Sequence, residues 1–415
     1  MLILQSAIGL TTFMCIAWVI SENRRAASWR VAVVGIALQI VIAAALLRVP
    51  QARFVFVALN EAVLAVETAT AAGTSFVFGF LGGAELPYEE VPGSSSLVFA
   101  FRSLPLLILV SALTSLLTYW RILPWIVRGF SALLSRTLGV GGAVALSAAA
   151  NVFVGMVEAP LFIRSWLGQL SRGELFMVMS TGMATIAGTV LFLYTSILAD
   201  VLPGAVGHLV TASLISAPAA ISAAWLMIPP EFGTAADTRV QSNEATGAMD
   251  AITQGTQQGL KLYLNIIAML IVLIALVELV NIVLTAGPDV AGEPLTMQRM
   301  LGWLMAPVAW LMGVPWAEAT QAGSLLGIKT ILNEFLAYIE LARLAQGDLS
   351  PRTTLIMTYA LCGMANLGSV GIMIGGFAAL IPERRAEVTE LAMKSIVGGT
   401  IATCCTGAVV GIVGA

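Results

Sequence analysis

Long apolar stretches separated by short polar segments recur along the 415-residue chain. A helix needs about 20 mostly apolar residues to cross the hydrocarbon core of a bilayer. Eight stretches satisfy this requirement and predict transmembrane helices, and the first lacks the small-residue cleavage site of a signal peptide. They cover residues 2–20, 31–47, 96–120, 175–199, 204–228, 262–285, 353–381 and 390–414.

Residues 51–95 follow a different pattern. The segment 54–66 is amphipathic, and the segment 73–93 is rich in glycine and carries the acidic residues Glu85, Glu89 and Glu90. An amphipathic helix of this kind lies in the plane of the membrane surface. We therefore predict an interfacial helix followed by an exterior loop.

Two further apolar segments, 139–170 and 319–346, lack a continuous run long enough to span. Both are rich in glycine, and they contain Glu158 and Glu334 respectively. Irregular backbone at membrane depth is tolerated only where protein buries it or where it lines water. The preferred interpretation is a pair of re-entrant hairpins; loops packed under the bundle are the alternative.

The basic residues predict the orientation, because cytoplasmic loops carry an excess of lysine and arginine. Thirteen of the 20 basic residues fall on the side of Arg24, Arg25 and Arg30. This side is therefore cytoplasmic, and both termini lie outside. The polar segment 231–258 becomes a cytoplasmic linker.

The linker divides the chain into related halves. The expected parts are 1–95, with two spans and the interfacial helix; 96–230, the first repeat half; the linker; and 259–415, the second half. In each half a hairpin with a glutamate precedes a span containing Gly-Met-Ala, at 182–184 and 363–365. The crossing count brings the two hairpins in from opposite sides, which makes the repeat inverted. Interrupted helices at corresponding positions point to a transporter's binding site.

The fold class is thus an all-α polytopic membrane protein with eight transmembrane helices plus two re-entrant hairpins in inverted repeats. Small residues alone would serve close helix packing. Ionised glutamates at mid-bilayer, however, are costly unless they are paired or hydrated. Glu158 and Glu334 therefore predict a polar ligand held between the halves.

Composition narrows the class of protein. Hydrophobic residues make up 59% of the chain and charged residues 10%, whereas soluble proteins need about 25% charged residues. The net charge of −3 and the scattered basic residues argue against binding to nucleic acid. The four cysteines show no metal-ligand spacing, and the sequence offers no nucleophile–base pair. We expect no enzyme activity.

Four blocks of sequence resemble the concentrative nucleoside transporter family. They are NVFVGMVEAP at 151–160, GMATIAG at 182–188, KTILNEFLAY at 329–338 and CGMANLGSVGI at 362–372. The resemblance extends from about residue 96 to the C-terminus. It implies a homotrimer in the inner membrane of a bacterial cell. Each protomer would move nucleosides inward with a cation by alternating access, and its fourth and seventh spans would be broken.

The resemblance also implies two binding sites. Glu158, Glu334, Asn366 and Ser369 would hold the ribose, and carboxylate and amide groups suit its hydroxyls. The implied substrate-binding set is Gly155, Met156, Val157, Glu158, Val190, Glu334, Met364, Asn366 and Ser369. The implied sodium ligands are Asn151, the carbonyl of Val154, Thr185 and the carbonyl of Ile186. Lys329 has two interpretations, pairing with a carboxylate or reaching toward the interface.

The first hairpin departs from the family pattern Gly-Gln-Thr-Glu-Ala-Pro. This chain has Met156 and Val157 where the family's glutamine and threonine contact the nucleobase, and Met364 where an aromatic residue is common. An apolar site discriminates by only about 1–3 kcal/mol per group. The hypothesis is that the ribose site is retained while base selectivity is relaxed or shifted, toward purine nucleosides or another ribosyl compound.

Sodium-coupled nucleoside import is the leading function, with no cofactor beyond the coupling ion. Proton coupling is an alternative, with Glu158 or Glu334 as the titrating group. Two other classes remain open: a sensor that does not transport, and an intramembrane enzyme acting on a ribosyl lipid or nucleotide.

Overall fold

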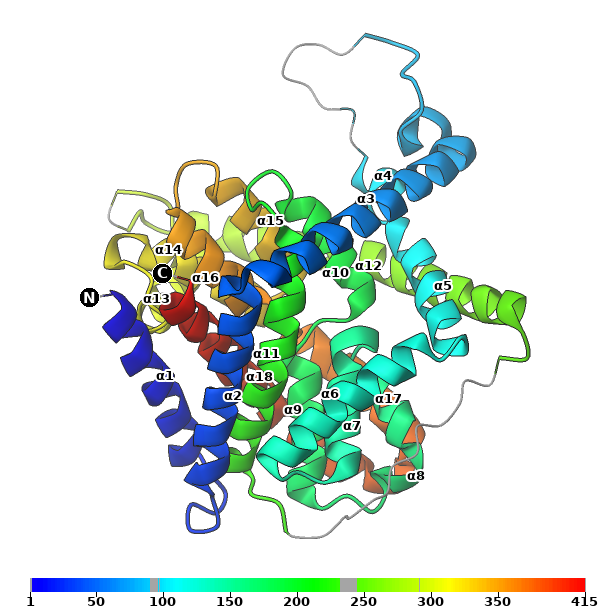
Figure 1. The fold of residues 1–415 in the computed structure, drawn as a ribbon. Coiled ribbons are helices and arrows are strands. Elements are labelled where there is room, and N and C mark those ends of the chain that lie inside the picture. Colours follow the sequence, from blue (N-terminus) through cyan, green and yellow to red (C-terminus); the bar gives the residue numbers. More distant parts are fainter. Residues whose placement is uncertain (1, 90–95, 97, 232–244, 291, 415) are drawn as a thin grey trace.

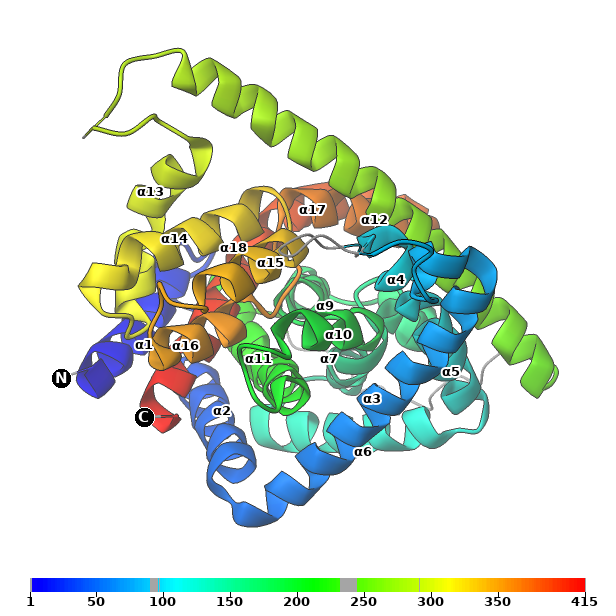
Figure 2. The same ribbon diagram turned by 90° about the horizontal axis from the view of Figure 1, so that it is seen from above.

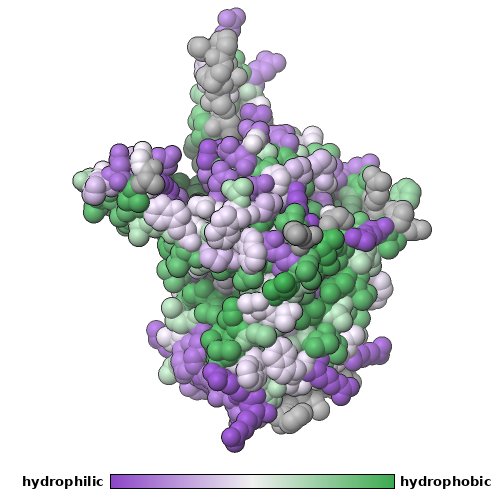
Figure 3. Space-filling view, turned by 90° about the vertical axis from the view of Figure 1, so that its left-hand side faces the viewer, coloured by the Kyte–Doolittle hydropathy of each residue, from purple (hydrophilic) through white to green (hydrophobic). Residues whose placement is uncertain are grey.

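The computed structural model describes residues 2–89, 96, 98–231, 245–290 and 292–414. Within these residues every regular element is a helix, apart from one isolated bridge between Val290 and Glu293. On the face that Figure 3 presents, hydrophobic residues form a band around the middle and hydrophilic residues gather at both ends. That distribution is typical of a protein whose middle lies in lipid.

The elements fall into three groups along the chain (Figure 1). The first group comprises α1 (Leu2–Val19), α2 (Trp29–Arg48), α3 (Pro50–Phe78), η1 (Gly79–Gly82) and α4 (Phe99–Arg102). The second comprises α5 (Leu106–Tyr119), α6 (Ile122–Leu138), α7 (Gly142–Val154), η2 (Ala159–Ile163), α8 (Arg164–Leu167), α9 (Arg172–Ala184), α10 (Gly188–Leu198) and α11 (Ala205–Met227). The third comprises α12 (Ala248–Thr285), α13 (Met297–Leu311), α14 (Trp316–Ile331), α15 (Glu334–Leu344), α16 (Pro351–Leu361), α17 (Leu367–Leu380), η3 (Pro382–Arg384) and α18 (Arg385–Val413).

Eight candidate spans are present among the described residues, by length and composition. The predicted count is confirmed, but the set differs from the predicted one in two places. The segment Phe56–Gly82 qualifies, whereas residues 353–381 are split into α16 and α17. Figures 1 and 2 show α3 crossing the ends of α2 and α11 rather than running beside them. This course fits the predicted interfacial helix, although the helix continues beyond the predicted end at residue 66.

The structure describes only parts of the predicted exterior loop and of the predicted linker. Residues 90–95 of the exterior loop and 232–244 of the linker lie outside the described residues. Helix α12 begins at Ala248, so the last residues of the predicted linker are helical. A 38-residue helix is longer than a membrane crossing needs, so its first turns extend past the apolar run.

The second hairpin is more elaborate than predicted. The chain bends by 115° between α13 and α14, and it turns again between α14 and α15. Helix α13 was not predicted, because its apolar run is short and contains Pro307. A proline inside a helix removes one backbone hydrogen bond and favours a local kink.

The two halves repeat one order of elements, which supports the inverted-repeat fold. In each half a leading helix (α5 or α12) precedes a hairpin, a broken span and a long closing helix (α11 or α18). The leading helices pack against each other, and each closing helix contacts the broken spans of both halves. Figure 2 shows α12 along one edge of the molecule, beside α5 and away from α1 and α2.

Candidate functional site

The tip of the first hairpin lies against the break in the fourth span. Helix α7 ends at Val154, and Gly155 has a φ of 101°, a left-handed conformation that favours glycine. A Cβ atom on Gly155 would lie 2.9 Å from the Cβ of Ala187, which is in the break between α9 and α10. A side chain at position 155 would therefore push the tip away from the break.

The breaks of the two interrupted spans meet each other. A Cβ atom on Gly363 would lie 2.8 Å from the carbonyl oxygen of Ala184, the last residue of α9. A Cβ atom on Gly399 of α18 would meet both Met183 and Ala365, at 2.6 and 3.2 Å. Small residues thus bring four pieces of backbone together at the centre of the molecule, as the repeat predicts.

Asn151 ties the first hairpin to α9. Its Nδ2 donates to the carbonyl oxygen of Thr181 at 2.9 Å and to the hydroxyl of Thr185. The hydroxyl of Thr185 donates in turn to the Thr181 carbonyl. Asn151 is buried, yet its Oδ1 has no hydrogen-bond partner. A buried amide oxygen without a donor is costly, and a cation would satisfy it.

The other two predicted sodium ligands lie at the end of α7 and in the break of the fourth span. Val154 is the last residue of α7, and Ile186 lies between α9 and α10. Carbonyl groups at a helix end lack intrahelical donors, so they are free to ligate. An all-oxygen set of amide, hydroxyl and carbonyl groups fits a hard cation such as Na⁺. The residues present therefore fit the ion that the resemblance implied.

Glu334 lies at the start of α15, in a network from three elements. The hydroxyl of Tyr194 donates to its Oε1 at 2.8 Å, and Nδ2 of Asn366 donates to its Oε2 at 2.9 Å. Its side chain is buried. Two neutral donors and the N-terminal end of α15 stabilise the carboxylate where lipid and protein exclude most water.

Aromatic rings line the side of Glu334 that faces α10. The ring of Tyr194 lies 4.7 Å from that of Tyr338 and 6.4 Å from that of Phe335, between centroids. Sequence reasoning missed Tyr194. The available signal was a tyrosine hydroxyl within an apolar span, since buried hydroxyls require a partner.

The structure brings together only part of the predicted substrate set. Asn366 links Glu334 to Ser369, because its Oδ1 accepts from the Ser369 backbone N–H at 2.8 Å. Glu158 is exposed, and within the described residues its carboxylate forms no hydrogen bond to this group. Of the other predicted residues, Val190 is buried and Met364 is half-buried.

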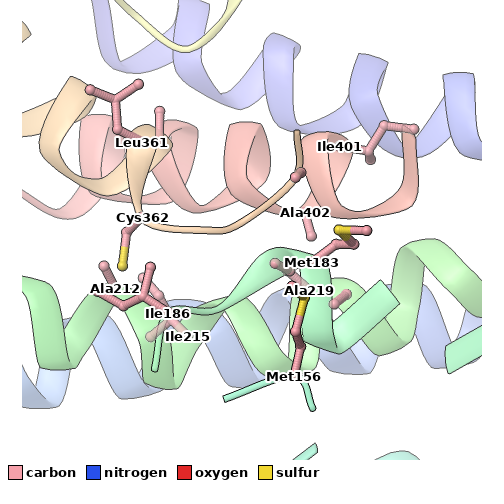
Figure 4. Packing of buried hydrophobic residues seen from close by; sticks show 14 of the residues in the cluster. Met156, Met183, Ile186, Ala212, Ile215, Ala219, Leu361, Cys362, Ile401 and Ala402 are labelled. Carbon is pink, nitrogen blue, oxygen red and sulfur yellow. The ribbon is translucent and has the colours of Figure 1, made fainter. Parts of the chain in front are cut away.

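The two unusual residues of the first hairpin pack against small residues. A Cβ atom on Gly182 of α9 would lie 3.0 Å from the Cβ of Met156, and one on Gly376 of α17 would lie 3.2 Å from Val157 Cγ1. Met156 is 5% exposed. Figure 4 shows it among buried hydrophobic residues that include Met183 and Ile186. The tip of the first hairpin is therefore apolar both where it faces α9 and where it faces α17.

The geometry defines a class of protein. Two hairpins and two broken spans converge within a membrane-spanning helical bundle, around the buried carboxylate of Glu334 and the buried amide of Asn151. Discontinuous helices that meet inside such a bundle are typical of the binding sites of secondary transporters. It is the architecture of a secondary transporter.

Comparisons with known proteins identify the family. A model of the Na+ dependent nucleoside transporter N-terminus matches residues 8–81, and one of its C-terminus matches residues 208–411. Residues 100–201 match a nucleoside recognition model named Gate. Together the three models match nearly every described helix of the chain.

Whole-chain relatives agree with the models. The chain is 35% identical to the nucleoside permease NupC of Helicobacter pylori, across 99% of this chain and 97% of that protein. It is 33% identical to the sodium/nucleoside cotransporter 1 of Rattus norvegicus, across 99% of this chain and 63% of that protein. An uncharacterized transporter of Haemophilus influenzae is 35% identical, across 99% of this chain and 98% of that one.

Solved structures share the whole fold. CNTnw in an inward-facing substrate-bound state aligns with a TM-score of 0.90 at 34% identity, covering 100% of this chain and 98% of that one. A CNTnw variant in an outward-facing state gives 0.92 at 34% identity, with the same coverage. The chain therefore belongs to the concentrative nucleoside transporter family, a family of Na⁺-dependent transporters and not of enzymes.

Proposed function

We propose that this chain imports nucleosides and is driven by sodium. The observation that carries the proposal is the buried carboxylate of Glu334, which Tyr194 and Asn366 hold in place at the meeting point of the repeats. A fixed carboxylate accepts hydrogen bonds from two vicinal hydroxyls, as a ribose offers. Glu158, exposed on the facing hairpin, supplies the second carboxylate.

Sodium would bind where Asn151 Oδ1 lacks a donor, with Val154, Thr185 and Ile186 as the other ligands. Bound there, the ion would join the end of α7 to the break in the fourth span. Ordering of the hairpin tip by the ion would prepare Glu158, which follows directly in the chain, for the sugar. Ion and solute binding would thus favour each other.

The central test is uptake of radiolabelled nucleosides into proteoliposomes at fixed pH. An inward sodium gradient should drive accumulation, and replacing sodium by choline should abolish it. Glu334→Gln should lose uptake, because an amide both removes the negative charge and donates where the carboxylate accepts. Accumulation driven by a proton gradient without sodium would support the proton-coupled alternative instead. Substrate binding without uptake would support a sensor.

The apolar hairpin tip supports an altered preference for the nucleobase or another ribosyl compound. Met156 offers no paired hydrogen bonds, and Val157 offers no hydroxyl. The test is a competition panel of nucleosides, free bases and ribose. The double variant Met156→Gln, Val157→Thr should change relative affinities between bases by about tenfold or more. Met156→Leu is the matched control, because it keeps the tip apolar and should leave the preference unchanged.

The topology and assembly belong to the same proposal. Arg352 donates to Gly411 of α18 and to Ser6 of α1, so both ends of the chain lie on one side. The basic residues favour the outside for that end, and the similarity to a bacterial nucleoside permease favours a bacterial inner membrane for the protein. The proposed parts remain 1–95, 96–230, 231–258 and 259–415. Cysteine labelling of Ser6 variants in intact cells tests the orientation.

A homotrimer is proposed for the assembled protein. Only 6% of the apolar window of α12 is buried within one chain, and residues such as Ile271, Val272 and Ile274 are exposed. Association through α12 and α5 would leave the hairpins and broken spans free to move against a fixed centre. Native mass spectrometry of the purified protein tests the number of subunits.

A further inference from the structure

Lys329 is a buried cation without a counter-ion in contact. It lies in the last turn of α14 and is 1% exposed. Its Nζ donates to the carbonyl oxygen of Ala360 at 2.8 Å and to the hydroxyl of Thr403 at 2.9 Å. No carboxylate within the described part of the chain forms an ion pair with it. Both interpretations of Lys329 from the sequence, the ion pair and the reach to the interface, are therefore wrong.

Two neutral oxygens do not offset the cost of burying an ammonium group. The backbone around Lys329 supplies the missing negative potential. Helix α14 ends at Ile331 and α16 ends at Leu361, and the two helices are in contact. Each C-terminal end carries roughly half a negative charge from its unpaired carbonyl groups. Ala360, which accepts from Lys329, is one of the last residues of α16.

The first half of the chain has the same pair of helix ends. Helix α7 ends at Val154 and α9 ends at Ala184, and these helices are also in contact. Asn151 occupies the last turn of α7 and donates to the Thr181 carbonyl of α9, much as Lys329 of α14 donates to the Ala360 carbonyl of α16. Asn151 is neutral, and its Oδ1 remains without a donor.

Each half therefore has a pair of helix C-terminal ends whose negative potential requires a positive charge, and only the second half supplies that charge from a side chain. We propose that the ammonium group of Lys329 is a built-in replacement for a coupling cation, holding the second hairpin to the broken seventh span in the place that corresponds to the sodium site of the first half. The inference rests on the proposed sodium site at Asn151. Lys329 is a positioning residue, since it contacts neither solute nor ion.

The coupling ratio follows from this assignment. The second half needs no ion from solution, so one sodium ion accompanies each nucleoside.

The wild-type coupling ratio is the first test. Sodium and nucleoside fluxes are measured together in proteoliposomes, with charge movement as a second readout. A ratio of one sodium ion per nucleoside is expected. A ratio of two would overturn the inference, since the second half would then bind an ion of its own. Wild-type protein without any sodium-driven uptake would instead refute the proposed function itself.

Two variants separate charge from packing. Lys329→Met keeps much of the side-chain volume but removes the charge, and we expect uptake to fall more than about tenfold at every sodium concentration. Lys329→Ser leaves room for an ion among the Ala360 carbonyl, the Thr403 hydroxyl and the new hydroxyl. Its uptake should recover at high sodium, with the Hill coefficient rising from one toward two. Lys261→Ser, at an exposed position of α12, is the matched control.

Thermal unfolding in detergent provides a readout that is independent of transport. Sodium should raise the melting temperature of Lys329→Ser by more than it raises that of the wild type. For Lys329→Met, the rise in melting temperature should be no larger than the rise for the wild type. Wild-type uptake by Lys329→Met overturns the inference. A folded Lys329→Ser that gains nothing from sodium in either assay also overturns it. Where neither variant folds, the wild-type coupling ratio decides.

Discussion

Asn366 binds Glu334 and shapes the helix that follows it. Its Nδ2 donates to Glu334 Oε2 at 2.9 Å, while its Oδ1 accepts from the Ser369 backbone N–H at 2.8 Å and so caps α17. One side chain thus fixes both the carboxylate of the second hairpin and the start of the second half of the seventh span. Movement of the second hairpin would therefore displace the start of α17, and movement of α17 would displace Glu334.

Asn366→Ala should impair transport and stability together. Loss of an N-cap costs about 0.5–2 kcal/mol, and Glu334 would lose a donor as well. Uptake should fall at least tenfold, with a lower melting temperature. Ser350→Ala is the matched control, because Ser350 caps α16 by accepting from Thr353 and its hydroxyl bonds to Glu318 rather than to Glu334. It should lower the melting temperature with little effect on nucleoside affinity; an equal loss of affinity would contradict the assignment of Asn366 to the site.

Tyr194→Phe should weaken nucleoside binding without disturbing the fold. The substitution removes one hydrogen bond to a buried charged group, worth about 1.5–3 kcal/mol, and keeps the ring. Equilibrium binding should show a rise in Kd of about tenfold or more. Tyr338→Phe serves as the control, since its hydroxyl donates to the Thr358 carbonyl rather than to a carboxylate. If both variants bind like the wild type, Tyr194 does not tune Glu334.

Asn151→Ala should abolish stabilisation by sodium. In the wild type, replacing choline chloride with sodium chloride should raise the melting temperature, because an ion that binds the folded state stabilises it. The variant lacks the amide oxygen and should show no difference between the salts. Thr181→Val is the control: it keeps the carbonyl that accepts from Asn151 and loses only a hydroxyl that bonds within α9. An undiminished sodium effect in Asn151→Ala would place the ion elsewhere.

A network of charges at the opposite end from the termini should make stability depend on pH. Arg172 lies 2.9 Å from Glu22 and 2.6 Å from Glu390, and Lys394 bonds to both carboxylates. The hydrogen bond from Arg172 is the main reason that the pKa of Glu22 lies below its usual 4.5. The carboxylate stabilises the fold above pH 4.5, and this contribution is lost as the pH falls through the lowered pKa.

Glu22→Gln should therefore lower the melting temperature at pH 7 but not well below pH 4.5. The effect should stay under about 1 kcal/mol, because the side chains are partly exposed and solvent screens them. High salt should shrink it further. Thermal unfolding of both proteins across this pH range is the measurement. Glu61→Gln, at an exposed glutamate of α3, should match the wild type throughout; a Glu22 effect that persists at low pH would point to packing instead.

The sequence by itself determined the membrane class, the number of spans, and the pairing of hairpins with broken spans. These properties depend on local composition: an apolar run of sufficient length has no stable place outside lipid, and irregular backbone at membrane depth is tolerated only where protein or water protects it. The carboxylates Glu158 and Glu334 could also be identified from local composition, because a charged residue within an apolar segment is costly unless it is paired, hydrated or bound to a ligand.

Only the tertiary structure decided which partners these groups have. Tyr194 and Glu334 are 140 positions apart in the chain, and Lys329 reaches Thr403 across 74. The start of α12 and the bend before α14 likewise depend on what the helices pack against. No local pattern encodes such contacts. Each polar atom in a low-dielectric interior must find a donor, an acceptor or an ion, and the folded chain alone determines which of these lies within reach.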